Sequence, residues 1–170
     1  MTASPAIPPR RLLYVNHVAL IGGAEESLLE TLRTLDRTRY QPMAAIPRRG
    51  PLAARLTALG VPVFLVPVRR LVRTRNPFKR LADAVSVAVG VWRLSGLIRR
   101  ERIELVHANS TTAQLYAGPA ARRAGVPCVW HCRDWVELGR WEDWLAARAS
   151  AMVAISGAVA RHLERNRARP

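Results

Sequence analysis

The chain has 170 residues, of which 49% are hydrophobic, and it carries a formal net charge of +15. This length and composition are typical of one globular domain with its own core, and they exclude a disordered chain. The basic balance favours an anionic partner such as nucleic acid, lipid headgroup or phosphorylated substrate, although Lys79 is the only lysine and codon bias toward arginine alone can produce this charge.

From the N-terminus, residues 1–10 are rich in proline, lack the apolar stretch of an export signal and are predicted to form a flexible tail. Short apolar runs then alternate with helical stretches. The predicted strands are residues 11–16, 40–46, 61–66, 103–107, 126–131 and 151–155. The predicted helices are roughly residues 24–35, 51–59, 77–101, 111–124, 141–149 and 157–166.

The predicted strands do not alternate cleanly between apolar and polar residues, which is typical of strands buried on both faces of a parallel sheet. Gly60 and Gly125 each end a helix ahead of Val-Pro and a strand, and Asn76-Pro77 begins the longest helix. Strands that alternate with helices over short links predict right-handed crossovers. The fold class is therefore α/β, a doubly wound parallel sheet of the Rossmann-like kind.

The longest predicted helix contains an 18-residue apolar stretch, residues 81–98. Asp83 and Arg93 interrupt this stretch, so a buried helix is a better interpretation than a membrane span. Apolar and small residues at spacings of three and four define one face of the helix, namely Phe78, Ala82, Val85, Val89, Trp92 and Gly96.

The segment "IGGAEESL" joins the first predicted strand to a helix. Gly22 and Gly23 let the backbone turn sharply or approach a ligand, and a helix N-terminus favours anions. Glu25 and Glu26 satisfy the helix dipole, so a tight turn with acidic capping explains most of the pattern. The G-x-G-x-x-G dinucleotide motif is absent. A ligand-binding role therefore needs support from other loops at the carboxyl edge of the sheet, where such folds bind ligands.

Two more polar clusters follow strands at this edge. In "VHANSTT", His107, Asn109 and Ser110 form a group suited to sugar hydroxyls or phosphate oxygens, although Ser110 could simply cap a helix. In "VWHCRDW", His131 is followed by the pair Arg133 and Asp134. A lone histidine at a strand end is more often structural, but three clusters on one edge favour a site.

The two cysteines, Cys128 and Cys132, lie roughly 13 Å apart along one predicted strand, at about 3.3 Å per residue. That separation excludes a disulfide between them. The spacing with His131 matches no zinc pattern, so reduced core thiols and no metal site are expected.

A basic segment, "PVRRLVRTRNPFKRL", mixes cations with Leu71, Val72 and Phe78. Such a mixture can seat a protein on an anionic membrane surface, and the alternative is a solvated loop. The residues of this candidate membrane or anion patch are Arg69, Arg70, Arg73, Arg75, Lys79 and Arg80.

Four segments, taken in their order along the chain, are informative together: "GGAEESLLETLRTL", "GPLAARLTALGVPVFLVP", "IELVHANSTTAQLYAGPAARRAGVPCVWHCRD" and "ASAMVAISGAVARHL". They resemble the N-terminal domain of retaining GT-B glycosyltransferases of the family-4, or group-1, type. The resemblance covers about residues 11–165, and its most specific pieces are G-G-x-E and A-I-S-G-A-V.

The resemblance implies transfer of a hexose from a nucleotide sugar to a glycan or lipid-linked acceptor, with retention, in a cleft between two Rossmann-like domains. Gly22 and Gly23 would approach the donor diphosphate, and His131, the candidate catalytic residue, would lie near the transferred sugar. The nucleotide sugar is a co-substrate, and neither a cofactor nor a metal is expected. The acceptor side would be lined by Glu25, His107, Asn109, Ser110, Arg133 and Asp134.

The family's second domain, with its E-x7-E element, has no counterpart in the sequence. Residues 11–166 are expected to form the acceptor-binding domain, and residues 167–170 the truncated start of an interdomain linker. The isolated chain is therefore expected to be inactive without a donor domain, and to be cytoplasmic at the inner face of the membrane.

Two other functions are compatible with the same residues. A binding-only Rossmann-like domain would hold a nucleotide or phosphate ligand without a second domain. A basic nucleic-acid-binding domain is the weaker alternative, because no helix-turn-helix, zinc or RNA-recognition signature is present, and no nucleic acid partner is expected.

Overall fold

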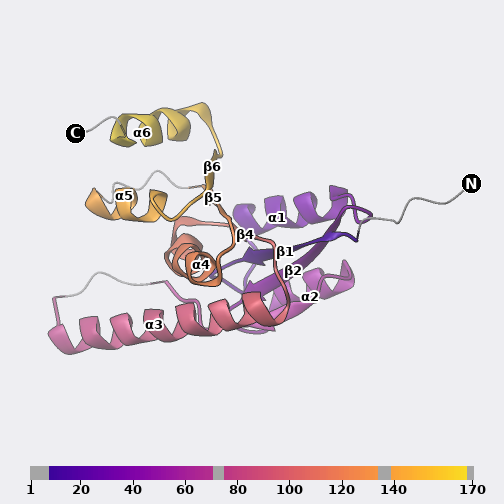
Figure 1. The fold of residues 1–170 in the computed structure, drawn as a ribbon, viewed down its shortest axis with the longest axis horizontal. Helices are drawn as coiled ribbons and strands as arrows, with labels where there is room; N and C mark the ends of the chain where they lie inside the picture. The colour runs from indigo at the N-terminus through magenta and orange to yellow at the C-terminus, as the bar shows by residue number, and fades with distance from the viewer. Residues whose placement is uncertain (1–7, 71–74, 134–138, 168–170) are drawn as a thin grey trace, which may run out of the picture.

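Six parallel strands form a single sheet in the order β3-β2-β1-β4-β5-β6 (Figure 1). The computed structural model describes residues 8–70, 75–133 and 139–167. The strands are β1 (Arg10–Val15), β2 (Tyr40–Ile46), β3 (Val63–Leu65), β4 (Leu105–Ala108), β5 (Cys128–Cys132) and β6 (Ala151–Ala154). The helices are α1 (Gly23–Thr34), α2 (Pro51–Ala58), α3 (Pro77–Arg100), α4 (Thr111–Ala124), α5 (Arg140–Ala146) and α6 (Gly157–Arg167). The predicted doubly wound parallel sheet is confirmed.

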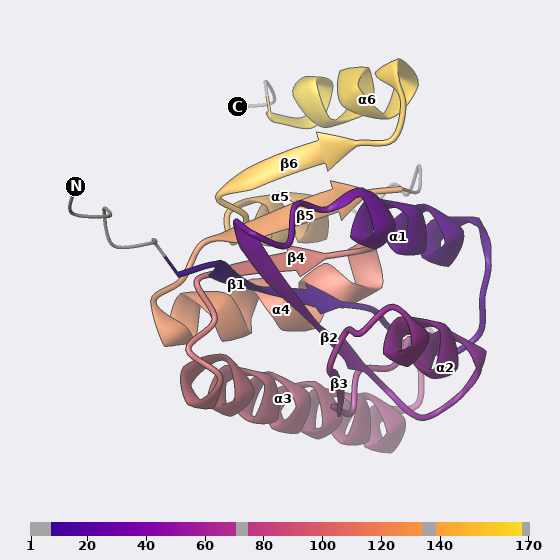
Figure 2. The ribbon, with the colours of Figure 1, turned by 90° about the vertical axis from the view of Figure 1, so that its right-hand side faces the viewer.

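The central strands are buried on both faces, as their continuous apolar sequences predict. On one face of β1, Leu12 and Tyr14 pack with Leu28 and Leu52 of α1 and α2. On the other face, Leu13 packs with residues of α3 and α4. A third cluster joins β5 to α5 and α6. Helices therefore cover both faces of the sheet (Figure 2), and the loops at the carboxyl ends of the strands are left to form a site.

The helix boundaries follow from local chemistry. The Asn76 side chain accepts hydrogen bonds from the backbone N–H groups of Phe78 and Lys79, at 3.0 and 3.2 Å, and so caps α3. Gly125 ends α4 with a left-handed φ of 75°, a conformation that glycine adopts without the steric cost of a Cβ. Cys128 and Cys132 are buried and form no disulfide, as expected, and burial raises the pKa of Cys128 to about 12.

Helix α3 was expected to be buried, and this expectation was wrong for one of its faces. The face that contains Phe78, Val85 and Trp92 points outward, with exposed fractions of 82%, 55% and 63%. The opposite face, which includes Gly90 and Leu94, packs into the core instead. At Gly90 the missing side chain allows a close approach to α4, because a Cβ there would lie only 2.7 Å from ring atoms of Tyr116.

Candidate functional site

Glu25 holds the Gly-Gly loop to the body of the protein. Its Oε2 accepts a hydrogen bond from the backbone N–H of Gly22 at 3.0 Å, and its Oε1 accepts one from Asn16 Nδ2 at 3.1 Å. The side chain lies at the N-terminus of α1, where the helix dipole favours a negative charge. Only 5% of Glu25 is exposed, so its carboxylate stabilises the loop rather than facing solvent.

Asn109 connects this loop to the end of β4. Its Nδ2 donates to Asn16 Oδ1 at 3.1 Å and to the carbonyl oxygen of Ala24 at 3.3 Å. Asn16, which follows β1, thereby bridges Glu25 and Asn109, and both asparagines are buried. The two amide groups meet in one hydrogen bond because β1 and β4 are neighbours and end at the same edge.

Arg133 extends the network to β5. Its Nε and Nη2 donate to Asn109 Oδ1 at 3.2 and 3.0 Å, and Nη2 also lies 3.2 Å from His131 Nδ1. A guanidinium has only donors, so Nδ1 of His131 must accept this hydrogen bond. The neutral His131 ring consequently carries its proton on Nε2. Hydrogen bonds thus join the Gly-Gly loop, the end of β4 and the end of β5 into one assembly.

His107 and His131 lie next to each other on one face of the sheet. Their ring centroids are 5.5 Å apart in an edge-to-face arrangement, and the ring of Tyr14 follows at 5.0 Å from His107. Burial lowers the pKa of His107 to about 4, with further lowering by the charges of His131 and Arg133. Burial, and then Arg133, lowers the pKa of His131 to about 4 as well. Both imidazoles are neutral at pH 7.

Ser110 links the first loop to α4 through a different pair of contacts. Its Oγ accepts a hydrogen bond from the backbone N–H of Ala113 at 3.1 Å, so Ser110 caps α4. The same oxygen lies 2.9 Å from Nδ1 of His17. The cap and the loop contact together account for this buried hydroxyl.

The two glycines differ in what the fold requires of them. A Cβ on Gly22 would lie 3.2 Å from the Glu25 carboxylate, whereas a Cβ on Gly23 would have no neighbour within 4 Å. Neither residue has the positive φ that favours glycine. The first N–H groups of α1 have no partner within the helix, whereas the N–H groups of Glu25 and Glu26 donate to the carbonyl oxygen of Gly22. Gly23 is exposed and Ala24 is partly buried, so the backbone N–H groups of these two residues are the part of the loop that a ligand can approach.

The structure brings the predicted residues Gly22, Gly23, Glu25, His107, Asn109, Ser110, Arg133 and His131 to the carboxyl edge of the sheet. It buries Glu25, Asn109 and Ser110 within the hydrogen-bond network. Asp134 and Arg73 lie outside the described residues. Arg69, Arg70, Arg75, Lys79 and Arg80 are exposed, before and at the start of α3.

Asn16 and His17 were not predicted as site residues, although both follow β1 at the carboxyl edge. Their sequence signal was their position alone, polar side chains placed directly after a buried strand. The contacts to Glu25 and Ser110 depend on the packing of α1 against the sheet, which no local pattern reports.

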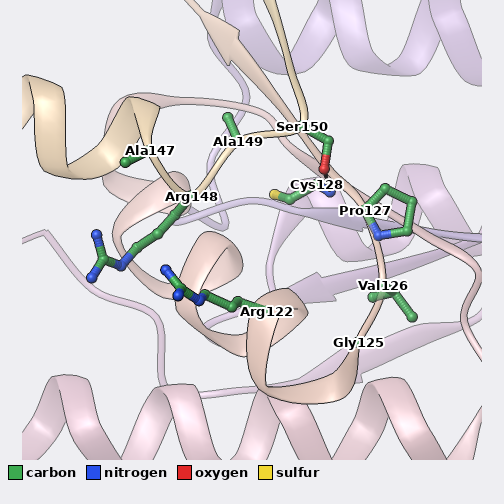
Figure 3. Close-up of a pocket in the computed structure, with 9 residues that line it drawn as sticks. All are labelled: Arg122, Gly125, Val126, Pro127, Cys128, Ala147, Arg148, Ala149 and Ser150. Atoms are coloured by element: carbon green, nitrogen blue, oxygen red, sulfur yellow. Dashed lines mark hydrogen bonds between the residues drawn. The ribbon is translucent and has the colours of Figure 1, made fainter.

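A pocket of about 420 Å³ lies at the opposite, amino-terminal edge of β5 and β6 (Figure 3). Its lining includes Arg122, Cys128, Arg148 and Ser150, and none of the predicted site residues. The Arg148 side chain stacks over the Trp144 ring at 3.7 Å and donates to the Trp144 carbonyl. This pocket is separate from the carboxyl-edge network.

The carboxyl edge offers two kinds of hydrogen-bond donor. The helix N-terminus at Gly23 and Ala24 suits an anion such as a phosphate. The Nε2–H of His131 is a neutral donor suited to a hydroxyl group. An anion next to a hydroxylated ring is the combination that a sugar phosphate or a nucleotide sugar presents.

Comparisons with known proteins show which family the chain resembles. Residues 21–170 match the family model described as Glycosyltransferase Family 4. The chain is 27% identical over 121 residues to the UDP-Gal:alpha-D-GlcNAc-diphosphoundecaprenol alpha-1,3-galactosyltransferase of Escherichia coli. The aligned segment covers 71% of this chain and 29% of that enzyme.

Solved structures show the same fold at low sequence identity. Alr3699/HepE of Anabaena in complex with UDP-glucose aligns with a TM-score of 0.69 and 20% identity, over 94% of this chain and 41% of that one. MurG of Acinetobacter baumannii aligns with a TM-score of 0.67 and 16% identity, over 89% and 42%. The chain thus spans less than half the length of these relatives and corresponds to a single Rossmann-like half of the GT-B fold. It belongs to glycosyltransferase family 4.

Proposed function

We propose that this chain is the acceptor-binding half of a retaining glycosyltransferase, which moves a hexose from a nucleotide sugar to a glycan or lipid-linked acceptor. The observation that carries the proposal is the hydrogen-bonded assembly that runs from Gly22 through Glu25, Asn16, Asn109 and Arg133 to His131. It fixes a phosphate-compatible helix N-terminus and a hydroxyl-compatible imidazole in one arrangement. The E. coli relative, a galactosyltransferase by name, supports a lipid-linked acceptor.

The donor diphosphate would meet the backbone N–H groups of Gly23 and Ala24. The N–H of Gly22 is already donated to Glu25, so it is not the contact for the phosphate. Preorganised N–H donors stabilise the negative charge that develops on a leaving diphosphate. Glu25 does not oppose this role, because two hydrogen bonds hold its carboxylate inside the loop.

His131 would donate its Nε2–H to a hydroxyl of the transferred sugar. Its low pKa keeps the ring neutral, so it orients the sugar and does not act as a cationic acid at neutral pH. His107, one ring further along the sheet, would face the acceptor. We assign no protein nucleophile, in keeping with front-face transfer and retention.

A second domain would complete the site. The carboxyl edge of the sheet has hydrogen-bond donors for one side of the diphosphate and the sugar. The nucleotide needs a second binding surface. We propose that a donor-binding domain supplies this surface and that the chain alone is inactive. The proposed reaction uses no metal, and chelation by EDTA is expected to leave transfer by a completed enzyme unchanged.

Isothermal titration calorimetry tests whether this chain binds the acceptor rather than the nucleotide-sugar donor. The probes are UDP-galactose and a short-chain lipid carrying a diphospho-GlcNAc headgroup. We expect the lipid analogue to bind with an affinity that falls roughly tenfold in His107→Ala, about 1.4 kcal/mol. Arg123→Ala, an exposed change on α4, is the control and should bind like the original chain.

The opposite pattern would favour a binding-only nucleotide domain. Micromolar binding of UDP-galactose without any binding of the lipid analogue would contradict the acceptor assignment. Affinity for a DNA or RNA duplex that falls steeply with salt would instead indicate a nucleic-acid-binding protein.

A further inference from the structure

Helix α3 presents a row of large apolar side chains to solvent. Phe78, Leu81, Val85, Val89 and Trp92 recur at spacings of three and four, and their exposed fractions are 82%, 65%, 55%, 40% and 63%. They lie on one side of the helix because residues at these spacings share a helical face. We call these five residues the α3 stripe. Exposed apolar patches of this extent mark surfaces that bind a partner or a membrane.

The other side of α3 is fixed in the fold. Gly90, Leu94, Leu97 and Ile98 are buried against α4 and the sheet. The backbone at Gly90 comes so close to α4 that an added Cβ would lie 2.7 Å from the Tyr116 ring. The helix is long and apolar enough to cross a bilayer by length and composition alone, yet crossing would require removal of this face from the core. A helix with one face in the core and one apolar face outside can therefore meet a membrane only by lying along its surface.

Positive charge surrounds the exposed N-terminal end of α3. Arg69, Arg70 and Arg75 are exposed in the segment that leads to the helix, and Lys79 and Arg80 are exposed in its first turn. Within α3 the only acidic residue is Asp83, which already pairs with Lys79 at 2.8 Å. Apolar side chains next to exposed cations match the acyl chains and headgroups of an anionic lipid surface.

The charge pattern also argues against a second copy of the chain as the occupant. A partner stripe would bring its own cations to the interface, and α3 has no unpaired acidic residue to meet them. The position of the helix favours a membrane as well. The helix forms the lower edge of the molecule in Figure 1 and Figure 2, and the side chains of the α3 stripe are exposed.

We propose that the α3 stripe, together with Arg69, Arg70, Arg75, Lys79 and Arg80, seats the protein on the surface of an anionic phospholipid bilayer. The helix lies in the plane of the interface, with Phe78, Leu81 and Trp92 among the headgroups. Because α3 follows β3, its N-terminal end lies toward the carboxyl edge of the sheet (Figure 1). Membrane binding therefore places that edge near lipid-linked molecules, but it does not depend on the glycosyltransferase function being correct.

Co-sedimentation with vesicles tests the proposal on the whole chain. Vesicles of phosphatidylcholine alone are compared with vesicles that also contain phosphatidylglycerol. We expect the original chain to bind the anionic vesicles and to be released by salt. Trp92→Ser should weaken binding by about tenfold, because the apolar Trp92 side chain moves from water into the membrane on binding and serine lacks this contribution. Trp141→Ser is the matched control, since Trp141 on α5 is 64% exposed, against 63% for Trp92, and should leave binding unchanged.

A second pair of variants tests the charges. Arg80→Glu should lower binding to the anionic vesicles several-fold, whereas Arg123→Glu on α4 should have little effect. Circular dichroism confirms that each variant is folded. Equal binding by Trp92→Ser and Trp141→Ser would overturn the proposal. So would a concentration-dependent dimer, seen by analytical ultracentrifugation, that Trp92→Ser disrupts while vesicle binding is absent.

Discussion

Glu25 is a carboxylate beside the predicted phosphate site, and its surroundings explain how the two coexist. Its oxygens accept from the backbone N–H of Gly22 and from Asn16, and the side chain is buried. Its negative charge stabilises the loop, and the proposed phosphate contacts are the backbone N–H groups of Gly23 and Ala24. The sequence suggested that Glu25 contacts the acceptor, whereas the geometry supports a role for Glu25 in positioning the Gly-Gly loop.

Arg133 influences the pKa and the tautomer of His131, and removal of its guanidinium has a measurable consequence. In Arg133→Leu, Nδ1 of His131 loses its donor and a nearby positive charge. We expect the pKa of His131 to rise from about 4 toward its ordinary value, only in part because burial is the larger cause. Nitrogen-15 NMR of the ring should show both neutral tautomers. An unchanged pKa and a single Nε2–H tautomer would contradict this assignment, and Arg123→Leu serves as the control.

His107 makes the stability of the fold depend on pH. Its pKa is about 4 in the folded chain, below the ordinary 6.5, so the unfolded chain binds more protons as the pH falls through this window. Stability is therefore lost as the pH falls from about 6.5 toward 4. We expect urea unfolding of His107→Gln to show a smaller loss between about pH 7 and pH 5. Part of the loss should remain, because His131 titrates similarly. An equal loss in both proteins would contradict the shift.

The residues of the carboxyl edge were only partly predictable. Gly22, His107 and His131 could be placed from the strand pattern, because polar residues that end parallel strands share an edge. The partners of Glu25, Asn109 and Arg133 could not, because they depend on side-chain contacts between segments up to 93 residues apart, such as Asn109 with Asn16.

At the scale of the element, α3 shows the limit of periodicity. Apolar residues occur on both sides of this helix, so the pattern predicted its length and could not decide which side faces the core. The deciding residue is Gly90, whose small size permits the close contact with Pro67 and Tyr116.

Two glycines within α3 give a matched test of this packing. Alanine is the better helix former at both positions by roughly 0.5–1 kcal/mol. A Cβ at Gly96 would have no neighbour within 4 Å, so Gly96→Ala should raise the free energy of unfolding. A Cβ at Gly90 would lie 2.7 Å from Pro67 O and the Tyr116 ring, so Gly90→Ala should lower it by about 1–3 kcal/mol. Urea unfolding measures both, and equal effects would contradict the packing.

At the scale of the whole molecule, the fold followed from the sequence more completely than the site did. Alternating strands and helices, with short links and Val-Pro junctions, predicted the parallel sheet that the structure confirms. We propose that this half supplies the acceptor site and His131 to a complete enzyme.

Transfer of galactose from UDP-galactose to a diphospho-GlcNAc lipid measures this contribution. The chain is assayed alone and fused to the part of the E. coli galactosyltransferase that it does not match. We predict no product from either half alone, transfer by the folded fusion, and at least about a hundredfold loss in the fusion with His131→Ala, roughly 2.7 kcal/mol. Transfer by the isolated chain, or a folded fusion whose rate is unaffected by His131→Ala, would contradict the account.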